Sequence, residues 1–377
     1  MIYLDHAATT PMRPGVWEAM APYAADRFGN SSGIHEVSRR AKNDLEEARE
    51  RIAALIGAQP AEIVFTSGGT ESDNLALKGA VFGPSRRDGV VTAASEHEAV
   101  LDTVDFLRRL GHRVDVVGVG PDGLVGTESV LSSLRPTTAV VSVMMVNNET
   151  GVVQDVVGLA AALGEAEPEV LFHTDAVQGF ASEQIDVERL RVDMMTISAH
   201  KVGGPKGTGL LYVREGTALE PVLHGGGQEL GRRSGTHDVA GAVGLATALE
   251  LAVDDRSRFS SVVGGIRDDF EKRALAGIDG ASVAGAGARR SPHHLNLRIP
   301  GVRNETMLVR LDRAGVGASA GSACQSGAAT VSHVLESMGL TAAQARESLR
   351  FSFGWNSTLD ESVEAAGILV DLVESLR

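Results

Sequence analysis

Few residues of this chain could carry covalent chemistry, and a lysine is the first of them. The chain has five lysines, and Lys201 closely follows a β-rich run, residues 192–198, and precedes a glycine-rich turn. A lysine at the end of a buried strand can form a Schiff base once burial and cationic neighbours lower its pKa. Lys42 and Lys78 fall in helical patterns that favour a solvated side chain, and Lys206 lies in the turn. The sequence therefore predicts that Lys201 is the lysine that forms a Schiff base.

The second candidate is Cys324, the one cysteine of the chain. It lies in a segment, residues 319–329, made almost wholly of small residues, which packs weakly and could carry a thiol between two places. A cysteine is more often a small buried hydrophobe, but small polar neighbours favour a reactive thiol. A single cysteine cannot form an intramolecular disulfide.

Polar residues gather where the predicted strands end. In open α/β sheets, ligands bind beyond the carboxyl ends of the strands. Polar residues after a single strand are common in loops, whereas polar residues at the corresponding end of five strands predict a shared site. The runs and their polar ends are 62–66 with Ser67-Gly68-Gly69-Thr70, 89–94 with Ser95-Glu96-His97, 139–146 with Asn147-Asn148, 170–174 with Asp175, and 192–198 with His200-Lys201.

The segment Gly68-Gly69-Thr70 is a candidate phosphate cradle. Glycines ahead of a helix expose backbone N–H groups, and a helix N-terminus favours an anion. Thr70 stands three residues before Asp73, which is the spacing of a capping box. An ordinary capped helix is therefore an equally good interpretation of this segment alone. No Gly-Lys-Ser/Thr follows, so the segment is not a nucleotide-binding P-loop.

His97 and Asp175 suit a flat, nitrogen-containing cofactor. With Ser95 as N-cap and Glu98 as its partner, His97 falls in the first turn of a helix, where the dipole disfavours protonation. A neutral ring there could stack on a heteroaromatic cofactor, although a lone histidine is more often a surface residue. Asp175 follows an apolar run, and a buried carboxylate needs a partner. An arginine is the common partner, and the protonated pyridine nitrogen of pyridoxal phosphate is the alternative.

The elements that must position these residues alternate between strands and helices. This pattern predicts an α/β fold with a largely parallel sheet. Residues 36–56 carry apolar side chains at spacings of three and four and stop at Gly57, as a helix does. After Val253 the amino-acid composition changes, and Gly- and Ala-rich turns follow. We expect a large domain, 16–253, and a smaller α+β domain made of 1–15 and 254–377. Further predicted strands are 113–117, 209–213 and 294–299, and further helices are 237–253 and 361–376.

Charge and composition exclude several classes of function. A net charge of −14 over 377 residues argues against direct binding to nucleic acid or anionic membranes. No apolar run approaches the ~20 residues that cross a bilayer, and the N-terminus lacks the features of a secretion signal. The histidines show no spacing typical of a metal site. We expect a cytoplasmic protein without a metal.

Taken in order, these segments resemble the cysteine desulfurases of the class-V aminotransferase family, nearly from end to end. The resemblance implies a fold of the aspartate aminotransferase type. The spacing between Cys324 and the helix-like residues 334–338 is similar to that of the branch with an extended, flexible cysteine loop. Further motifs that carry the likeness are Tyr3-Leu4-Asp5-His6-Ala7-Ala8-Thr9-Thr10-Pro11, Gly225-Gly226-Gly227-Gln228-Glu229, Arg233-Ser234-Gly235-Thr236 and Arg350-Phe351-Ser352-Phe353-Gly354.

The resemblance also implies site residues for pyridoxal 5'-phosphate and substrate. Lys201 would hold the cofactor, and His97 would stack on its ring. Where the family usually has Asn-Pro-Ser-Ser, this chain has Asn30-Ser31-Ser32-Gly33, which puts the exact role of Asn30 in substrate binding in doubt. The other implied ligands are Asp175 for the pyridine nitrogen, Gln178 for the ring hydroxyl, Gly69, Thr70, Ser198 and His200 for the phosphate, Thr236 from the other subunit of a homodimer, and Asn148 and Arg350 for the substrate carboxylate.

The implied reaction converts L-cysteine to L-alanine and leaves the sulfur on Cys324 as a persulfide. The sulfur then passes to an acceptor protein, by family analogy an iron–sulfur scaffold, with a tRNA thiolation enzyme or a DNA phosphorothioation protein as alternatives. A class-V transaminase would share Lys201, Asp175 and the phosphate loop but needs no thiol. Selenocysteine lyase activity is a close variant that the sequence leaves open.

Overall fold

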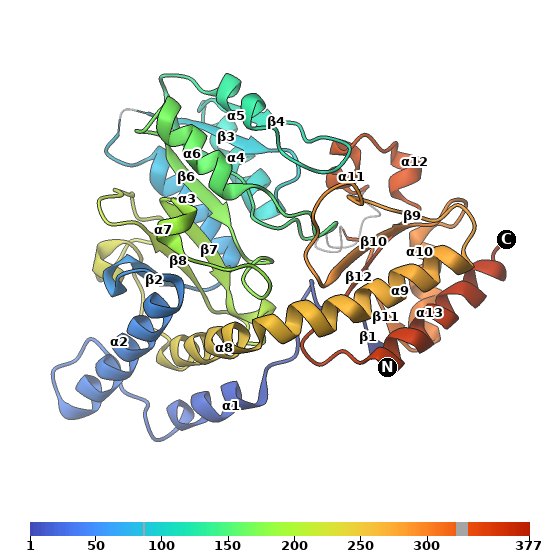
Figure 1. Ribbon diagram of the computed structural model, residues 1–377. Helices are drawn as coiled ribbons and strands as arrows, with labels where there is room; N and C mark the ends of the chain where they lie inside the picture. The colour runs from blue at the N-terminus through green and yellow to red at the C-terminus, as the bar shows by residue number, and fades with distance from the viewer. Residues whose placement is uncertain (86, 322–330) are drawn as a thin grey trace.

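The structure, a computed structural model, describes residues 1–85, 87–321 and 331–377. Its centre is a seven-stranded sheet in the order β2-β8-β7-β6-β5-β3-β4 (Figure 1). Strand β8 runs antiparallel to both neighbours, and the other pairs are parallel, which confirms the predicted α/β class. The strands are β2 (Ile63–Thr66), β3 (Gly89–Ala93), β4 (Val114–Val117), β5 (Thr138–Ser142), β6 (Leu171–Asp175), β7 (Met194–Ser198) and β8 (Gly209–Val213).

Helices pack on both faces of this sheet. Successive side chains of a strand point to opposite faces, so Val64 of β2 packs with α3 and α4, whereas Ile63 and Phe65 pack with α2 and α8. The sheet is thus buried on both sides, as parallel sheets are. The helices around it are α1 (Pro14–Met20), α2 (Glu36–Ile56), α3 (Gly69–Val81), α4 (Glu98–Arg109), α5 (Thr127–Ser133), α6 (Val156–Ala166), α7 (Val187–Leu190) and α8 (Val239–Arg258).

A second hydrophobic cluster combines the N-terminus with the C-terminal third of the chain. Ile2 and Leu4 pack there with residues between Phe259 and Val373. Its antiparallel sheet has the order β12-β10-β9, and β1 pairs with β11. The elements are β1 (Ile2–Tyr3), α9 (Gly264–Gly277), β9 (Ser282–Val283), β10 (His294–Arg298), α10 (Asn304–Arg313), β11 (Val316–Gly317), α11 (His333–Ser337), α12 (Ala342–Ala345), β12 (Ser348–Ser352) and α13 (Leu359–Glu374).

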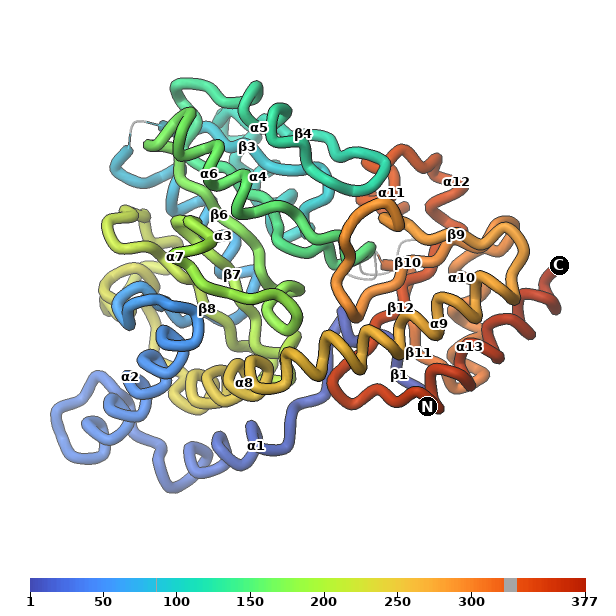
Figure 2. Tube along the Cα trace, in the orientation of Figure 1, coloured from blue at the N-terminus to red at the C-terminus, as the bar shows by residue number. Residues whose placement is uncertain are grey.

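One long helical rod joins the two clusters. Helix α8 continues through a π-helical turn, Phe259–Val263, into α9 (Figure 2). The predicted helix 237–253 is therefore too short, because the chain has no breaker at Val253 and stays helical up to Gly277. The division into domains at that residue stays a prediction.

The predicted strand 139–146 is also wrong at its end, because β5 stops at Ser142. Beyond that point Val143 and Met145 still donate to backbone carbonyls of the β6 strand, His173 and Asp175. On the other side β3 has already ended, and the Glu96 side chain accepts the Met144 N–H at 2.6 Å. Residues 143–146 are therefore paired on one side only and are not part of the strand.

In the described ranges, no helix combines the length and the apolarity needed to cross a membrane.

Phe270→Ala should strongly destabilise the second cluster. Phe270 is fully buried, with its ring 4.8 Å from Phe351 and 5.7 Å from Phe353. Truncating a buried phenylalanine to alanine costs about 3–5 kcal/mol. Urea denaturation followed by circular dichroism measures the loss. Phe82→Ala, at a side chain that is 41% exposed, is the control, and an equal loss in both variants would contradict the packing described.

Candidate active site

The parallel strands deliver the polar residues to one cavity of about 310 Å³. Strands β2, β3, β5, β6 and β7 all point the same way, so their carboxyl ends meet at one edge of the sheet. Ten of the predicted site residues line the cavity together. They are Gly69, Thr70, His97, Asn148, Asp175, Gln178, Ser198, His200, Lys201 and Arg350.

The start of α3, which was predicted to bind a phosphate, forms part of the cavity wall. Gly68 is the N-cap, with φ 147° and no side-chain cap, and the helix begins at Gly69. The predicted capping box is therefore wrong. Thr70 lies inside the helix, and Asp73 is buried toward the cavity. Because no side chain of the cap occupies the first N–H groups, they can bind an anion.

Asp175 is a buried carboxylate at the end of β6. Its Oδ1 accepts a hydrogen bond from the Val177 N–H at 2.8 Å. Burial raises the pKa of Asp175 to about 6, although the Val177 N–H and the nearby Lys201 lower it. A protonated pyridine nitrogen beside Asp175 would supply the positive charge that a buried carboxylate requires.

Asp73 is a site residue that the sequence did not identify as one. Burial, and then repulsion from Asp175, raises the pKa of Asp73 well above its ordinary value. Its Oδ1 lies 3.7 Å from Nε2 of His173, and burial lowers the pKa of that histidine to about 3. His173 is therefore neutral at pH 7, and its neighbour Asp73 takes up a proton more readily than an exposed aspartate does.

His97 caps the helix that follows it. Helix α4 begins at Glu98, and Nδ1 of His97 accepts the Ala99 N–H at 3.0 Å, so Ser95 is not the N-cap as predicted. Burial, and then the charge of Lys201, lowers the pKa of His97 to about 4. The ring is neutral at pH 7, and since Nδ1 accepts, its proton is assigned to Nε2.

The Lys201 amino group lies in the cavity against the N-terminal segment. Its Nζ donates to the backbone carbonyls of Ala7 and, at 2.8 Å, Ala8. The Gln178 amide also donates to the Ala7 carbonyl, at 2.9 Å. These two carbonyls of the N-terminal segment thus orient both side chains. The family resemblance pointed to residues 3–11 as a motif but not to these carbonyls, because backbone carbonyls leave no trace in residue type.

Arg350 and Asn148 also line the cavity. Arg350, on β12, donates to the Asn148 carbonyl at 2.9 Å and to Oδ1 of Asp5 at 2.8 Å. Nε of Arg350 and Oδ1 of Asn148 are buried and find no hydrogen-bond partner among the described residues. A guanidinium with unused donor capacity suits a planar carboxylate.

Two of the predicted site residues that the structure describes do not line the cavity. Asn30 and Thr236 are exposed and are not among the described residues that line it. Cys324 lies outside the described residues. Its described neighbours on either side both contact Glu149, because Ser332 donates to Oε2 of Glu149 at 2.5 Å and Gly321 lies against the same carboxylate.

The residues present fit pyridoxal phosphate. The cavity has a helix N-terminus for a phosphate, a buried carboxylate that needs a cation, a neutral ring and a lysine amine. Asn148, whose side-chain oxygen is buried without a hydrogen-bond partner among the described residues, lines the same cavity. Each feature corresponds to a different part of one ligand.

Known proteins match the chain along almost its full length. Residues 2–365 match the family described as Aminotransferase class-V. The chain is 40% identical over 377 residues to the cysteine desulfurase IscS of Dictyoglomus turgidum, covering 100% of this chain and 95% of that protein. It is similar to the structure of a NifS-like protein (TM-score 0.93, 33% identity, 99% of each chain). It is also similar to SspA in complex with cysteine (TM-score 0.83, 36% identity, 94% of this chain and 99% of that chain).

Asp175→Asn should stabilise the cofactor-free protein at neutral pH. The pKa of Asp175 is about 6 in the folded protein against an ordinary 3.8. Between these values the folded state binds more protons than the unfolded state, so this group's contribution to stability falls as pH rises through that window. The full shift corresponds to about 3 kcal/mol at pH 7.

Urea denaturation of the cofactor-free variant and wild type tests this effect. The variant's advantage should grow from near zero at about pH 4 to about 1–3 kcal/mol at pH 7. Asp102→Asn, at an exposed position of α4, should show no such trend. An advantage that stays constant with pH would show that the Asp175 charge is not its cause.

Proposed function

The chain belongs to the class-V aminotransferase family, and we propose that it acts as a pyridoxal-phosphate-dependent cysteine desulfurase. It converts L-cysteine to L-alanine and transfers the sulfur as a persulfide to Cys324 and on to an acceptor protein. The observation that carries the proposal is the single cavity that gathers Lys201, Asp175, His97 and Arg350. Whole-length similarity to cysteine desulfurases supports the same reaction.

In this proposal the cofactor supplies an electron sink for the charge that develops at the substrate Cα. Lys201 would hold it covalently, and Asp175 would keep its pyridine nitrogen protonated. His97 would stack on the ring and Gln178 would bind the ring hydroxyl. The phosphate would be bound at the start of α3 and the end of β7, by Gly69, Thr70, Ser198 and His200.

Lys201 and His97 are the groups that would move protons. The amine of Lys201, once displaced by substrate, would remove the Cα proton and later return one. His97 is neutral at pH 7 because burial lowers its pKa to about 4, and the proton assigned to its Nε2 could be donated within the cavity. Both residues line the same cavity.

Sulfur transfer would be the step that belongs to Cys324. Its thiolate would attack the substrate sulfur, so that a sulfur–sulfur bond forms and the substrate carbon–sulfur bond breaks. The electron pair of the broken bond would return to carbon, which takes up a proton to give alanine. Gly321, three positions before Cys324 in the sequence, supports this step, because its carbonyl accepts a hydrogen bond from the cavity residue Arg350 at 3.5 Å.

The remaining assignments concern domains, partners and location. We propose the large domain 16–253, the small domain 1–15 and 254–377, and a homodimer in which Thr236 of one subunit reaches the cofactor phosphate of the other. Asn30 would contribute to substrate binding. The acceptor would be an iron–sulfur scaffold, a tRNA thiolation enzyme or a DNA phosphorothioation protein, and the location would be the cytoplasm.

Cys324→Ala and Lys201→Ala should separate the two halves of the reaction. Cys324→Ala should keep the absorbance of the bound cofactor and lose turnover at least about 100-fold, because the cofactor site stays intact while the sulfur acceptor is gone. Lys201→Ala should lose the absorbance of covalently held cofactor. Alanine and persulfide assays with L-cysteine measure the outcome. If Cys324→Ala made alanine at the wild-type rate the desulfurase mechanism would be wrong, and release of a keto acid would indicate a transaminase.

Arg350→Lys should weaken cysteine binding. A lysine keeps the charge but loses the planar pair of donors that fits a carboxylate. The loss of one charge-assisted hydrogen bond, about 1.5–3 kcal/mol, should raise KM for L-cysteine about 10- to 100-fold with a smaller effect on kcat. Arg298→Lys, on the neighbouring strand β10 where Arg298 pairs with Glu347, is the control. An unchanged KM in Arg350→Lys would remove Arg350 from the carboxylate site.

A further inference from the structure

The exposed segment 225–238 has an unusual backbone. Glu229, Leu230 and Gly231 are consecutive residues in the left-handed region, with φ of 50°, 56° and 82°. Two of the three are not glycine, and left-handed residues of this kind persist only where the surroundings fix them. Leu230 is 77% exposed, so packing of its own side chain does not hold the turn.

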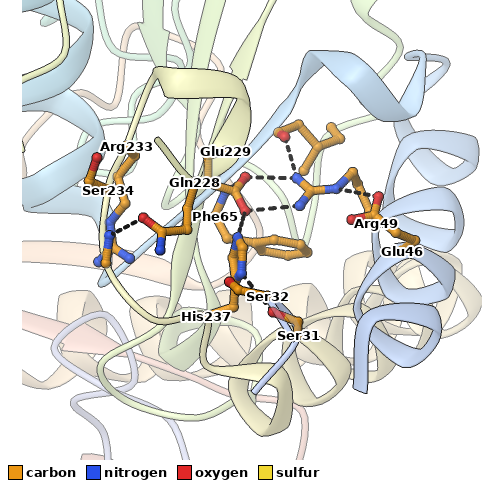
Figure 3. A network of polar contacts seen from close by, with 12 residues as sticks. Ser31, Ser32, Glu46, Arg49, Phe65, Gln228, Glu229, Arg233, Ser234 and His237 are labelled. Carbon is orange, nitrogen blue, oxygen red and sulfur yellow. Dashed lines mark hydrogen bonds and ion pairs between the residues drawn. The ribbon is translucent and has the colours of Figure 1, made fainter. Parts of the chain in front are cut away.

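The Glu229 side chain is what holds this turn. It is 1% exposed, and its two oxygens accept four hydrogen bonds (Figure 3). Arg49 of α2 donates through Nη1 and Nη2 at 2.8 and 2.9 Å, the Phe65 N–H of β2 donates at 2.9 Å, and Nε2 of His237 lies 2.9 Å away. Burial alone would raise the pKa of Glu229, but the bonds from Arg49 and His237 lower it to about 2. The carboxylate is therefore a charged, saturated anchor.

The anchor also reaches the loop that contains Asn30. The second ring nitrogen of His237, Nδ1, lies 2.8 Å from Oγ of the buried Ser31. Asn30 precedes Ser31 and is itself exposed. We call Arg49, Glu229, His237 and Ser31 the Glu229 cluster. The cluster connects two exposed loops through one buried carboxylate.

A second contact ties segment 225–238 to the phosphate end of the cavity. Arg233 pairs with Glu71 in the first turn of α3, at 2.7 and 3.2 Å. The other function of Glu71 is to accept the Ser67 N–H at 2.7 Å, just before the predicted phosphate loop. Thr236 is exposed between these two fixed points, Arg233 and His237. Its position on the surface is thus determined from both sides.

We infer that Glu229 is a positioning residue that presents Thr236 and Asn30 to the cofactor site of a second copy of this chain. The inference rests on the proposed function, which supplies the homodimer and the cofactor phosphate. Asn30 and Thr236 belong to the predicted site residues but are not among the described residues lining the cavity of their own chain. The Glu229 cluster holds both outside it in one rigid unit.

A cofactor titration of Glu229→Gln tests the inference. The amide cannot accept all four bonds, so apparent affinity for pyridoxal phosphate should fall at least about 10-fold. Glu250→Gln is a matched control, because Glu250 of α8 accepts two hydrogen bonds from Arg51, which lies on α2 as Arg49 does. Its affinity should stay within about twofold of wild type. Thermal unfolding of the cofactor-free proteins measures the loss of stability separately.

Equal cofactor affinity in wild type and Glu229→Gln would overturn the inference, and so would an equal loss in Glu250→Gln. If Glu229→Gln does not fold, His237→Ala removes one donor and the bond to Ser31. It should weaken cofactor binding in the same direction by a smaller factor. An unchanged affinity in that variant would equally count against the inference.

Mixed dimers show on which chain the effect falls. One chain carries Lys201→Ala, so that only the other can hold the cofactor covalently. Glu229→Gln placed on the Lys201→Ala chain should weaken cofactor binding in its partner, whereas the same change on the intact chain should leave its own site unaffected. The reverse pattern would overturn the inference alone. A wild-type protein that binds the cofactor as a monomer would instead overturn the proposed homodimer.

Discussion

A carboxylate that the fold has removed from water constrains everything else in this cavity. Asp175 is fixed at the end of β6, and burial raises its pKa to about 6. Glu96 and Asp73 are buried nearby, and burial followed by repulsion involving Asp175 raises their pKa as well. Three carboxyl groups at one end of a sheet are costly unless protons or cations compensate them. One cation, the protonated pyridine nitrogen of a bound cofactor, would be enough to balance the single charge of Asp175.

The two hydrophobic clusters contribute different ends of the site. The sheet and α3 of the first cluster provide Asp175, His97 and the helix N-terminus, whereas Arg350 comes from β12 of the second. Arg350 is tied back to the first cluster through the Asn148 carbonyl. The cofactor would therefore be bound mainly by one cluster and the substrate carboxylate between the two. The continuous rod α8–α9 fixes the separation of the clusters (Figure 1).

The sequence predicted the elements whose local signals agree with their packing. Helix α2 has the predicted bounds because its apolar spacing and the left-handed Gly57 point to the same end. Where the end of an element or the role of a residue depended on a distant part of the chain, the prediction was wrong or none could be made. The apolar run after Ser142 is not a strand because β3 ends early, and Thr70 is no cap because Gly68 starts the helix without one. Ten cavity residues were predicted because they stand at strand ends or in family motifs, whereas Asp73 and the Ala7 and Ala8 carbonyls act through position alone.

The Glu229 cluster explains how the loop at Asn30 can be ordered without the proline that the family usually has there. A proline restricts a loop through its fixed φ. Here Ser31 occupies that place and bonds His237, which bonds the buried Glu229. The hydrogen bonds that Glu229 accepts satisfy the buried charge and fix the side chain in place. One buried carboxylate can therefore hold the turn at Glu229 and, through His237, the loop at Asn30.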